Sequence, residues 1–69
     1  MGDPRLGSRL KESRTAAGLT QQGLADKASV SRKTINTVEN GVFVPSTVLA
    51  LELARALDTT VEALFFLRD

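Results

Sequence analysis

The sequence predicts an all-α domain, a compact bundle of five short helices, and two observations lead to this prediction. Gly18, Gly41 and Pro45 divide the 69 residues into short segments, because glycine ends helices and proline interrupts them. A serine, threonine or aspartate precedes each segment, at the position where such side chains cap helices. The length allows one small domain, so residues 1–69 are treated as a single unit.

The first three helices are predicted from their caps and apolar spacing. Asp3 as N-cap and Pro4 at the first helical position predict a helix that runs to Gly18, with Leu6, Leu10 and Ala17 on its buried side. Thr20 caps a helix over 21–28, and its inward residues are Leu24, Ala25 and Ala28. Ser31 caps a helix that ends at Asn40, and its inward residues are Ile35 and Val38.

The last two helices are more apolar. Ser46 caps a helix over 47–57, in which eight of eleven residues are apolar, so we expect it to be buried nearly all round. Thr60 caps a short helix over 61–65, and the tail that follows is expected as a short strand or an extended arm. One small core can hardly cover so much apolar surface, so a partner surface is expected.

Composition excludes several classes of function. Histidine, cysteine, tryptophan and tyrosine are absent, so we expect no metal site, no cofactor, no disulfide and no Cys–His or Ser–His nucleophile. An enzyme is therefore not expected. No apolar run approaches the roughly 20 residues of a membrane span, and a cysteine-free chain without a signal peptide fits the cytoplasm.

Charge is distributed unevenly along the chain, although the net charge is only +1. Residues 1–33 carry seven basic and three acidic residues, whereas residues 34–69 carry two basic and five acidic residues. This asymmetry favours a basic face that binds a polyanion and a second face that has a different role. Ordinary solvated charge is the alternative interpretation.

The short connection at 28–30 predicts a helix-turn-helix over residues 20–40. A turn of about three residues forces a steep crossing and leaves the polar side of the second helix exposed, where it can enter a DNA major groove. The segment GLTQQGLADKASVSRKTINTVENG resembles the core of the Cro/lambda-repressor-like family, the xenobiotic-response-element regulators of bacteria. The continuation VPSTVLALELARALDTTVEALF is similar to the fourth and fifth helices of that family, and the resemblance covers residues 5–67.

The resemblance implies a set of DNA-contacting residues. It implies base contacts from the outward side of the second helix of the motif, by Arg32, Lys33, Asn36 and Thr37. It implies a phosphate contact by Gln21 at the start of a helix, and Ser31, Thr34 and Asn40 are further phosphate candidates. It also implies a structural ion pair between Arg14 and Glu39. The alternative is that Arg32 and Lys33 are solvated and that Gln21 caps its own helix.

The sequence departs from the family pattern at several places, and two of them bear on the turn and on DNA contact. Ser29 stands in the turn where many members have glycine, which predicts a cost if its φ is positive. The loop after Gly41 is often basic, but here it reads Val42-Phe43-Val44. Phosphate contacts from its side chains are therefore doubtful, and backbone N–H groups are the remaining donors.

The functional prediction is a sequence-specific transcriptional regulator, a repressor that binds a palindromic operator as a homodimer. One such helix reads only about 4–5 base pairs, so two copies about 34 Å apart are expected. We expect dimerisation through residues 46–69, with Val61, Leu64, Phe65, Phe66 and Leu67 at the interface; alternatively, Phe65 caps the core of its own chain and Phe66 is incidental. The alternatives in function are an antitoxin-type regulator, a DNA-binding fragment of a longer ligand-sensing regulator, and a protein-interaction module that does not bind DNA.

Overall fold

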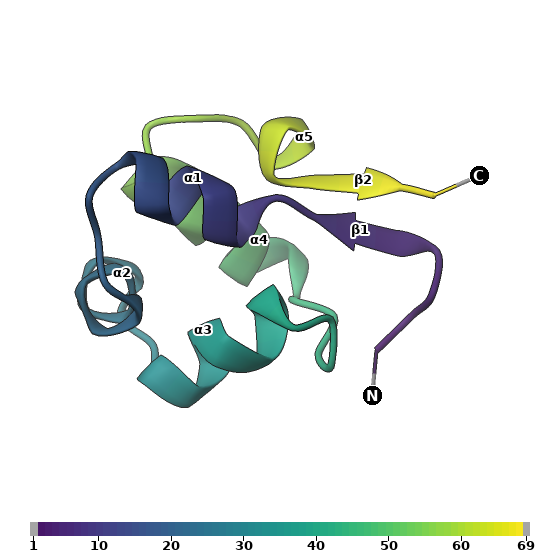
Figure 1. The fold of residues 1–69 in the computed structure, drawn as a ribbon, viewed down its shortest axis with the longest axis horizontal. Helices are drawn as coiled ribbons and strands as arrows, with labels where there is room; N and C mark the ends of the chain where they lie inside the picture. The colour runs from purple at the N-terminus through teal and green to yellow at the C-terminus, as the bar shows by residue number, and fades with distance from the viewer. Residues whose placement is uncertain (1, 69) are drawn as a thin grey trace.

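The computed structural model describes residues 2–68, which form five helices and one two-stranded antiparallel sheet (Figure 1). The sheet brings together the two ends of the chain, and the helices pack beside it. The elements in chain order are β1 (Leu6–Ser8), α1 (Leu10–Ala16), α2 (Gln21–Ala28), α3 (Arg32–Glu39), α4 (Thr47–Ala56), α5 (Val61–Leu64) and β2 (Phe65–Leu67).

Four helices begin at caps that the sequence predicts, and one of these caps is Thr60, whose hydroxyl accepts from the Ala63 amide at 3.2 Å at the start of α5. The hydroxyl of Thr20 accepts a hydrogen bond from the Gly23 amide at 2.9 Å, and Ser31 accepts one from Thr34 at 3.1 Å. Ser46 does the same for Leu49 at 3.1 Å. Each cap satisfies an amide that the first turn of the helix leaves unpaired, which explains why α2, α3, α4 and α5 start at these positions.

The prediction for the first helix is wrong at its start. Asp3 does not cap a helix: its backbone carbonyl accepts from the Leu6 amide at 3.0 Å and its carboxylate accepts from the Arg5 amide, which closes a turn. The chain then enters β1, and α1 begins only at Leu10. Pairing with a strand from the other end of the chain overrides the local helix signal of Asp3-Pro4. Ala17, expected to be buried, is exposed.

The tail is the strand β2, and it pairs within its own chain. Leu6, Gly7 and Ser8 stand opposite Leu67, Phe66 and Phe65. A side chain on Gly7 would overlap the Phe66 ring, so glycine lets this ring lie flat on β1. The guanidinium of Arg9 lies 4.0 Å from the centre of the same ring, a cation–π contact. The pairing thus fixes both ends of the domain.

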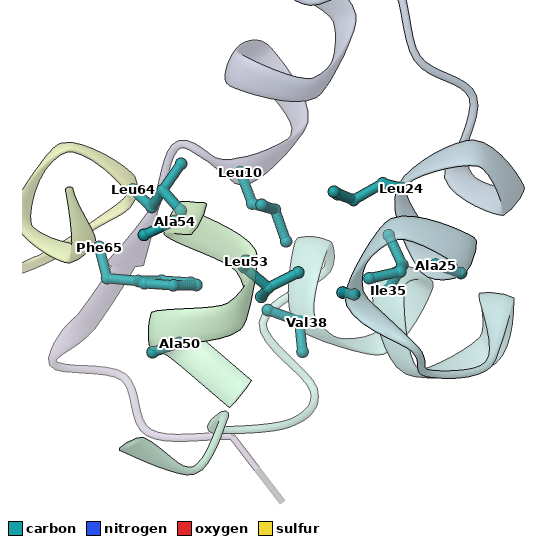
Figure 2. Packing of buried hydrophobic residues seen from close by; sticks show 11 residues of the cluster. Leu10, Leu24, Ala25, Ile35, Val38, Ala50, Leu53, Ala54, Leu64 and Phe65 are labelled. Carbon is teal, nitrogen blue, oxygen red and sulfur yellow. The ribbon is translucent and has the colours of Figure 1, made fainter. Parts of the chain in front are cut away.

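One core joins all five helices and β2. The fully buried large side chains come from α1, α2, α3, α4 and α5 and meet between the helices (Figure 2); they are Leu10, Leu24, Ile35, Val38, Leu53 and Leu64. The expectation that the fourth helix is buried nearly all round is wrong, because Val48 is 71% and Leu51 57% exposed. The core takes only one side of α4 and leaves an apolar side in solvent.

Candidate nucleic-acid interface

The turn between α2 and α3 sets the position of α3, the second helix of the helix-turn-helix. Ser29 adopts the left-handed conformation with φ 58°, and the Val30 amide returns to the Ala25 carbonyl at 3.0 Å. Ala25 is fully buried, and its small side chain lets α3 approach α2 closely. Ile35 and Val38 then fix the inner side of α3 in the core, so its other side faces outward along the edge of the molecule (Figure 1).

The outward side of α3 carries the residues that the resemblance implies for base contact. Arg32, Lys33 and Asn36 are exposed, and within residues 2–68 neither Arg32 nor Lys33 forms an ion pair. Thr37 is half-buried, and its hydroxyl donates to the Thr34 carbonyl at 3.0 Å. Arg32 and Lys33 are therefore free to bind a ligand, whereas Thr37 is partly engaged by its own helix.

The polar residues at the edges of this surface are tied to one another. The Ser31 and Thr34 hydroxyls lie 3.0 Å apart at the start of α3. At its end, the Asn40 side-chain amide donates to the Asn36 carbonyl oxygen at 3.2 Å. This last bond uses one lone pair of the Asn36 oxygen, and the two amide N–H donors of Asn36 form no hydrogen bond among residues 2–68.

The ion pair between Arg14 and Glu39 is present and joins α1 to α3. Arg14 Nε donates to Glu39 Oε2 at 2.5 Å and Nη2 donates to Oε1 at 3.2 Å, while Nη1 donates to the Leu19 carbonyl at 2.8 Å. Only 10% of the Arg14 side chain and 2% of the Glu39 side chain are exposed. The hydrogen bond to Glu39 raises the pKa of the Arg14 guanidinium above its ordinary value, so this arginine is a permanent positive charge.

Gln21 extends this network to the start of α2, which the sequence did not indicate. Its Nε2 donates to Glu39 Oε1 at 3.1 Å. One amide nitrogen carries two hydrogens, so the second remains for a further acceptor beside the N-terminus of α2. Glu39 thus orients a residue expected to bind phosphate, and it connects that residue to the helix expected to read bases.

Two of the three backbone N–H groups at Val42-Phe43-Val44 are engaged within the protein, and the Val44 amide forms no hydrogen bond among residues 2–68. The amides of Val42 and Phe43 both donate to the Thr37 carbonyl, at 2.9 and 3.3 Å, and that of Gly41 donates to Val38 at 3.2 Å. These three amides are used inside the protein. The side chains of Val42 and Phe43 are instead 56% and 42% exposed, so the loop presents an apolar surface next to α3.

The structure distributes the five residues expected at a dimer interface very differently. Leu64 is fully buried and Phe65 is 8% exposed, both in the core (Figure 2), so they have little surface for a partner. Phe66 packs on Gly7 and Arg9 of its own chain. Val61 is half-buried, and only Leu67, at 73%, is well exposed. The apolar surface of the acidic half lies instead on α4 and on the loop before it.

Neither a metal-ligand cluster nor a helix of membrane-spanning character occurs within residues 2–68. This part of the chain has no group of three or more acidic residues placed to hold a metal ion. None of its helices combines the length and the apolar character that crossing a membrane requires.

Comparison with known proteins identifies the family. A helix-turn-helix domain model matches residues 5–65. A helix-turn-helix-type transcriptional regulator of Archaeoglobus fulgidus is 40% identical over 62 residues, which cover 90% of this chain and 89% of the relative. The regulator YgzD of Bacillus subtilis is 34% identical over 90% of this chain and 94% of its own length.

Solved structures agree with the sequence relatives. The restriction-modification controller protein C.AhdI from Aeromonas hydrophila is similar with a TM-score of 0.76 and 42% identity, over 78% of this chain and 82% of that one. SinR, solved in complex with SinI, gives a TM-score of 0.75 at 27% identity, over 80% of this chain and 54% of that one. The protein therefore belongs to the helix-turn-helix family, as a DNA-binding transcriptional regulator of the Cro/lambda-repressor-like type.

Proposed function

We propose that this protein is a repressor that acts in the cytoplasm and binds a palindromic operator as a homodimer, with α3 in the major groove. The observation that carries the proposal is the outward side of α3, where Arg32 and Lys33 are exposed and form no ion pair within residues 2–68. Cationic side chains in the first turn oppose the helix dipole. Their placement there is explained by a ligand with negative charge and acceptor groups.

In this proposal the candidate residues have different roles. Arg32 and Lys33 donate to guanine O6 and N7, and the two free N–H donors of Asn36 reach acceptors on base edges. Gln21, oriented by Glu39, donates to a phosphate at the N-terminus of α2, and Ser31, Thr34 and Asn40 are further phosphate donors. Phosphate contacts set the position of the protein on DNA, while the contacts of Arg32, Lys33, Asn36 and Thr37 select the sequence.

The experiment is selection of bound sites from a random DNA pool, followed by titration of the chosen site. The proposal expects a two-fold symmetric site with half-sites about one helical turn apart, and affinity that falls steeply with salt. Arg32→Ala should reduce discrimination between the selected site and its mismatches by about 1–3 kcal/mol.

Lys27→Ala is the matched control. Lys27 is exposed in the last turn of α2 and is not among the base-contact candidates, so its loss should weaken binding to all sequences alike. An equal, sequence-independent loss for both variants would assign Arg32 to the phosphate backbone instead.

A second candidate function is a protein-interaction module that does not bind DNA. The exposed apolar loop at Val42 and Phe43, beside α3, favours it, because the family more often has basic residues there. Failure to select any DNA, together with a flat salt dependence, would support this function. A DNA-binding fragment of a longer regulator, or an antitoxin-type regulator, would also select a DNA site. Such a protein would differ from the proposed repressor in its oligomeric state or in the partner that it binds.

A further inference from the structure

Two large apolar side chains stand exposed on the loop that follows α3. Val42 is 56% and Phe43 is 42% exposed, and we call these two residues the apolar pair. Covering apolar surface contributes about 25 cal/mol per Å² of the area removed from water. A ligand that covers the apolar pair is therefore favoured, and the position of the loop indicates which ligand it is.

The backbone of the loop is fixed to the end of α3. The amides of Val42 and Phe43 both donate to the Thr37 carbonyl, at 2.9 and 3.3 Å, and Gly41 turns the chain with φ 72°. Thr37 is one of the residues proposed to select the DNA sequence. The apolar pair is therefore attached to the helix that is proposed to bind DNA, and it is carried to the DNA together with that helix.

The apolar pair belongs to the α3 side of the loop. An open groove lies beside α4 and is lined by Val44 and Pro45, but neither member of the apolar pair lines it. In Figure 1 the loop between α3 and α4 projects toward the same lower edge of the molecule as α3. The apolar pair thus continues the outward surface of α3.

The length of α3 brings this loop to the edge of the major groove. Its eight residues span about 12 Å, and the major groove is about 12 Å wide. When Arg32 and Lys33 at the start of α3 reach base edges, the residues just after its end lie beside the groove wall. Phosphates and deoxyribose rings form this wall, and thymine methyl groups project into the groove next to it.

The apolar parts of DNA are the groups that suit the apolar pair. Its side chains cannot bond to phosphate, and both of its amides are used within the protein. The chain has no charged residue from 40 to 51, so no carboxylate of this segment repels the DNA backbone. A protein partner fits less well, because an ordinary protein contact covers about 800 Å² on each side and the adjoining surface of α3 is polar and basic.

We propose that Val42 and Phe43 pack against apolar atoms of DNA at the edge of each half-site, either deoxyribose carbons or a thymine methyl group. The inference rests on the DNA binding proposed above and adds a contact to it. Salt weakens DNA binding through the counterions that Lys and Arg contacts release. An apolar contact releases none, so the loop supplies a part of the affinity that does not depend on salt.

The test measures the affinity for the selected DNA site over a range of salt concentrations. Phe43→Ala should raise the Kd about tenfold at every concentration and leave the slope of log K against log salt unchanged. Phe43→Leu keeps a large apolar side chain and should retain most of the affinity. Lys27→Ala is the electrostatic control: it removes an exposed cation, so it should weaken binding at low salt and make the slope shallower.

Hydroxyl-radical cleavage of the bound DNA distinguishes the two kinds of apolar atom, because this reagent attacks deoxyribose. If Phe43 covers sugars, Phe43→Ala should lose protection at those sugars alone. If Phe43 covers a thymine methyl group, uracil in place of that thymine should weaken the wild type and leave Phe43→Ala unaffected. Either result supports an apolar contact and assigns it.

Val42→Lys tests the position of the loop independently of Phe43. A lysine there should gain a phosphate contact and steepen the salt slope by about one, and circular dichroism should show all variants folded. Wild-type affinity of Phe43→Ala at every salt concentration, or an unchanged slope in Val42→Lys, would overturn the contact and leave DNA binding intact. Unchanged DNA binding with reduced self-association of Phe43→Ala in sedimentation would assign the loop to a protein contact instead. A wild type that selects no DNA would overturn the proposed function itself.

Discussion

Replacing Arg14 by methionine should remove much of the stability of this protein. The substitution keeps most of the apolar stem but deletes a guanidinium that makes three hydrogen bonds, two to Glu39 and one to the Leu19 carbonyl. The Glu39 side chain is only 2% exposed, so its carboxylate would stay buried with the Gln21 amide as its remaining side-chain partner.

The expected loss follows from that burial. Removing one partner of a buried ion pair costs about 3–5 kcal/mol, because the other charge is left without compensation. At roughly 0.05–0.15 kcal/mol per residue, a domain of this length has a total stability of about 3–10 kcal/mol. Arg14→Met should therefore lose between about a third and all of the stability of the domain.

Urea denaturation followed by circular dichroism at a fixed protein concentration measures this loss, since the chain has no tryptophan or tyrosine for fluorescence. The double variant Arg14→Met/Glu39→Met removes both charges and should recover most of the stability, because apolar residues of similar volume replace buried pairs at little cost. Arg5→Met is the control, since the Arg5–Asp3 pair is at the surface, and its midpoint should move far less than that of Arg14→Met. A loss below about 1 kcal/mol in Arg14→Met, or a double variant no better than the single one, would refute the reasoning.

Two further predictions concern backbone strain and acid titration. Ser29→Gly should stabilise the protein by about 0.5–1 kcal/mol in the same denaturation assay, because Ser29 has φ 58° and glycine adopts this region without the strain of a Cβ. Gly18→Ala, at φ 73°, should destabilise the protein by about 1 kcal/mol. Shifts of the same sign and size in Ser29→Gly and Gly18→Ala would contradict the explanation by backbone strain. The hydrogen bond from the Arg5 side chain lowers the pKa of Asp3 to about 2, so an NMR titration should find it there, and Arg5→Ala should return it toward 3.8. Because the pKa in the folded state is the lower one, this contact stabilises the fold above about pH 4, and its contribution is lost as the pH falls toward 2.

Much of the candidate site could be predicted from the sequence because its signals are local. The caps Thr20 and Ser31 and the apolar positions Ile35 and Val38 lie within the elements that they define. They place α2 and α3 and fix which side of α3 is exposed. The contact of Gln21 with Glu39 was not foreseen, since it joins residues 18 positions apart and depends on how α2 crosses α3.

The termini and the dimer surface show where such signals fail. Asp3-Pro4 is a sound start for a helix, yet β1 forms there because Phe65, Phe66 and Leu67 arrive alongside as a strand. The same pairing puts Phe66 on Gly7, which removes it from the surface on which the sequence had placed it. Apolar composition alone could not divide these residues between the core and a partner.

Local signals in the amino-acid sequence specify the helix-turn-helix and the polar side of its second helix, because caps, turns and apolar spacing act over a few residues. The folded arrangement was needed to show how the two ends of the chain pair, how Gln21 joins the Arg14–Glu39 pair, and which side of α4 stays exposed. Those features depend on residues far apart in the chain, and their positions are set by the packing of the whole core.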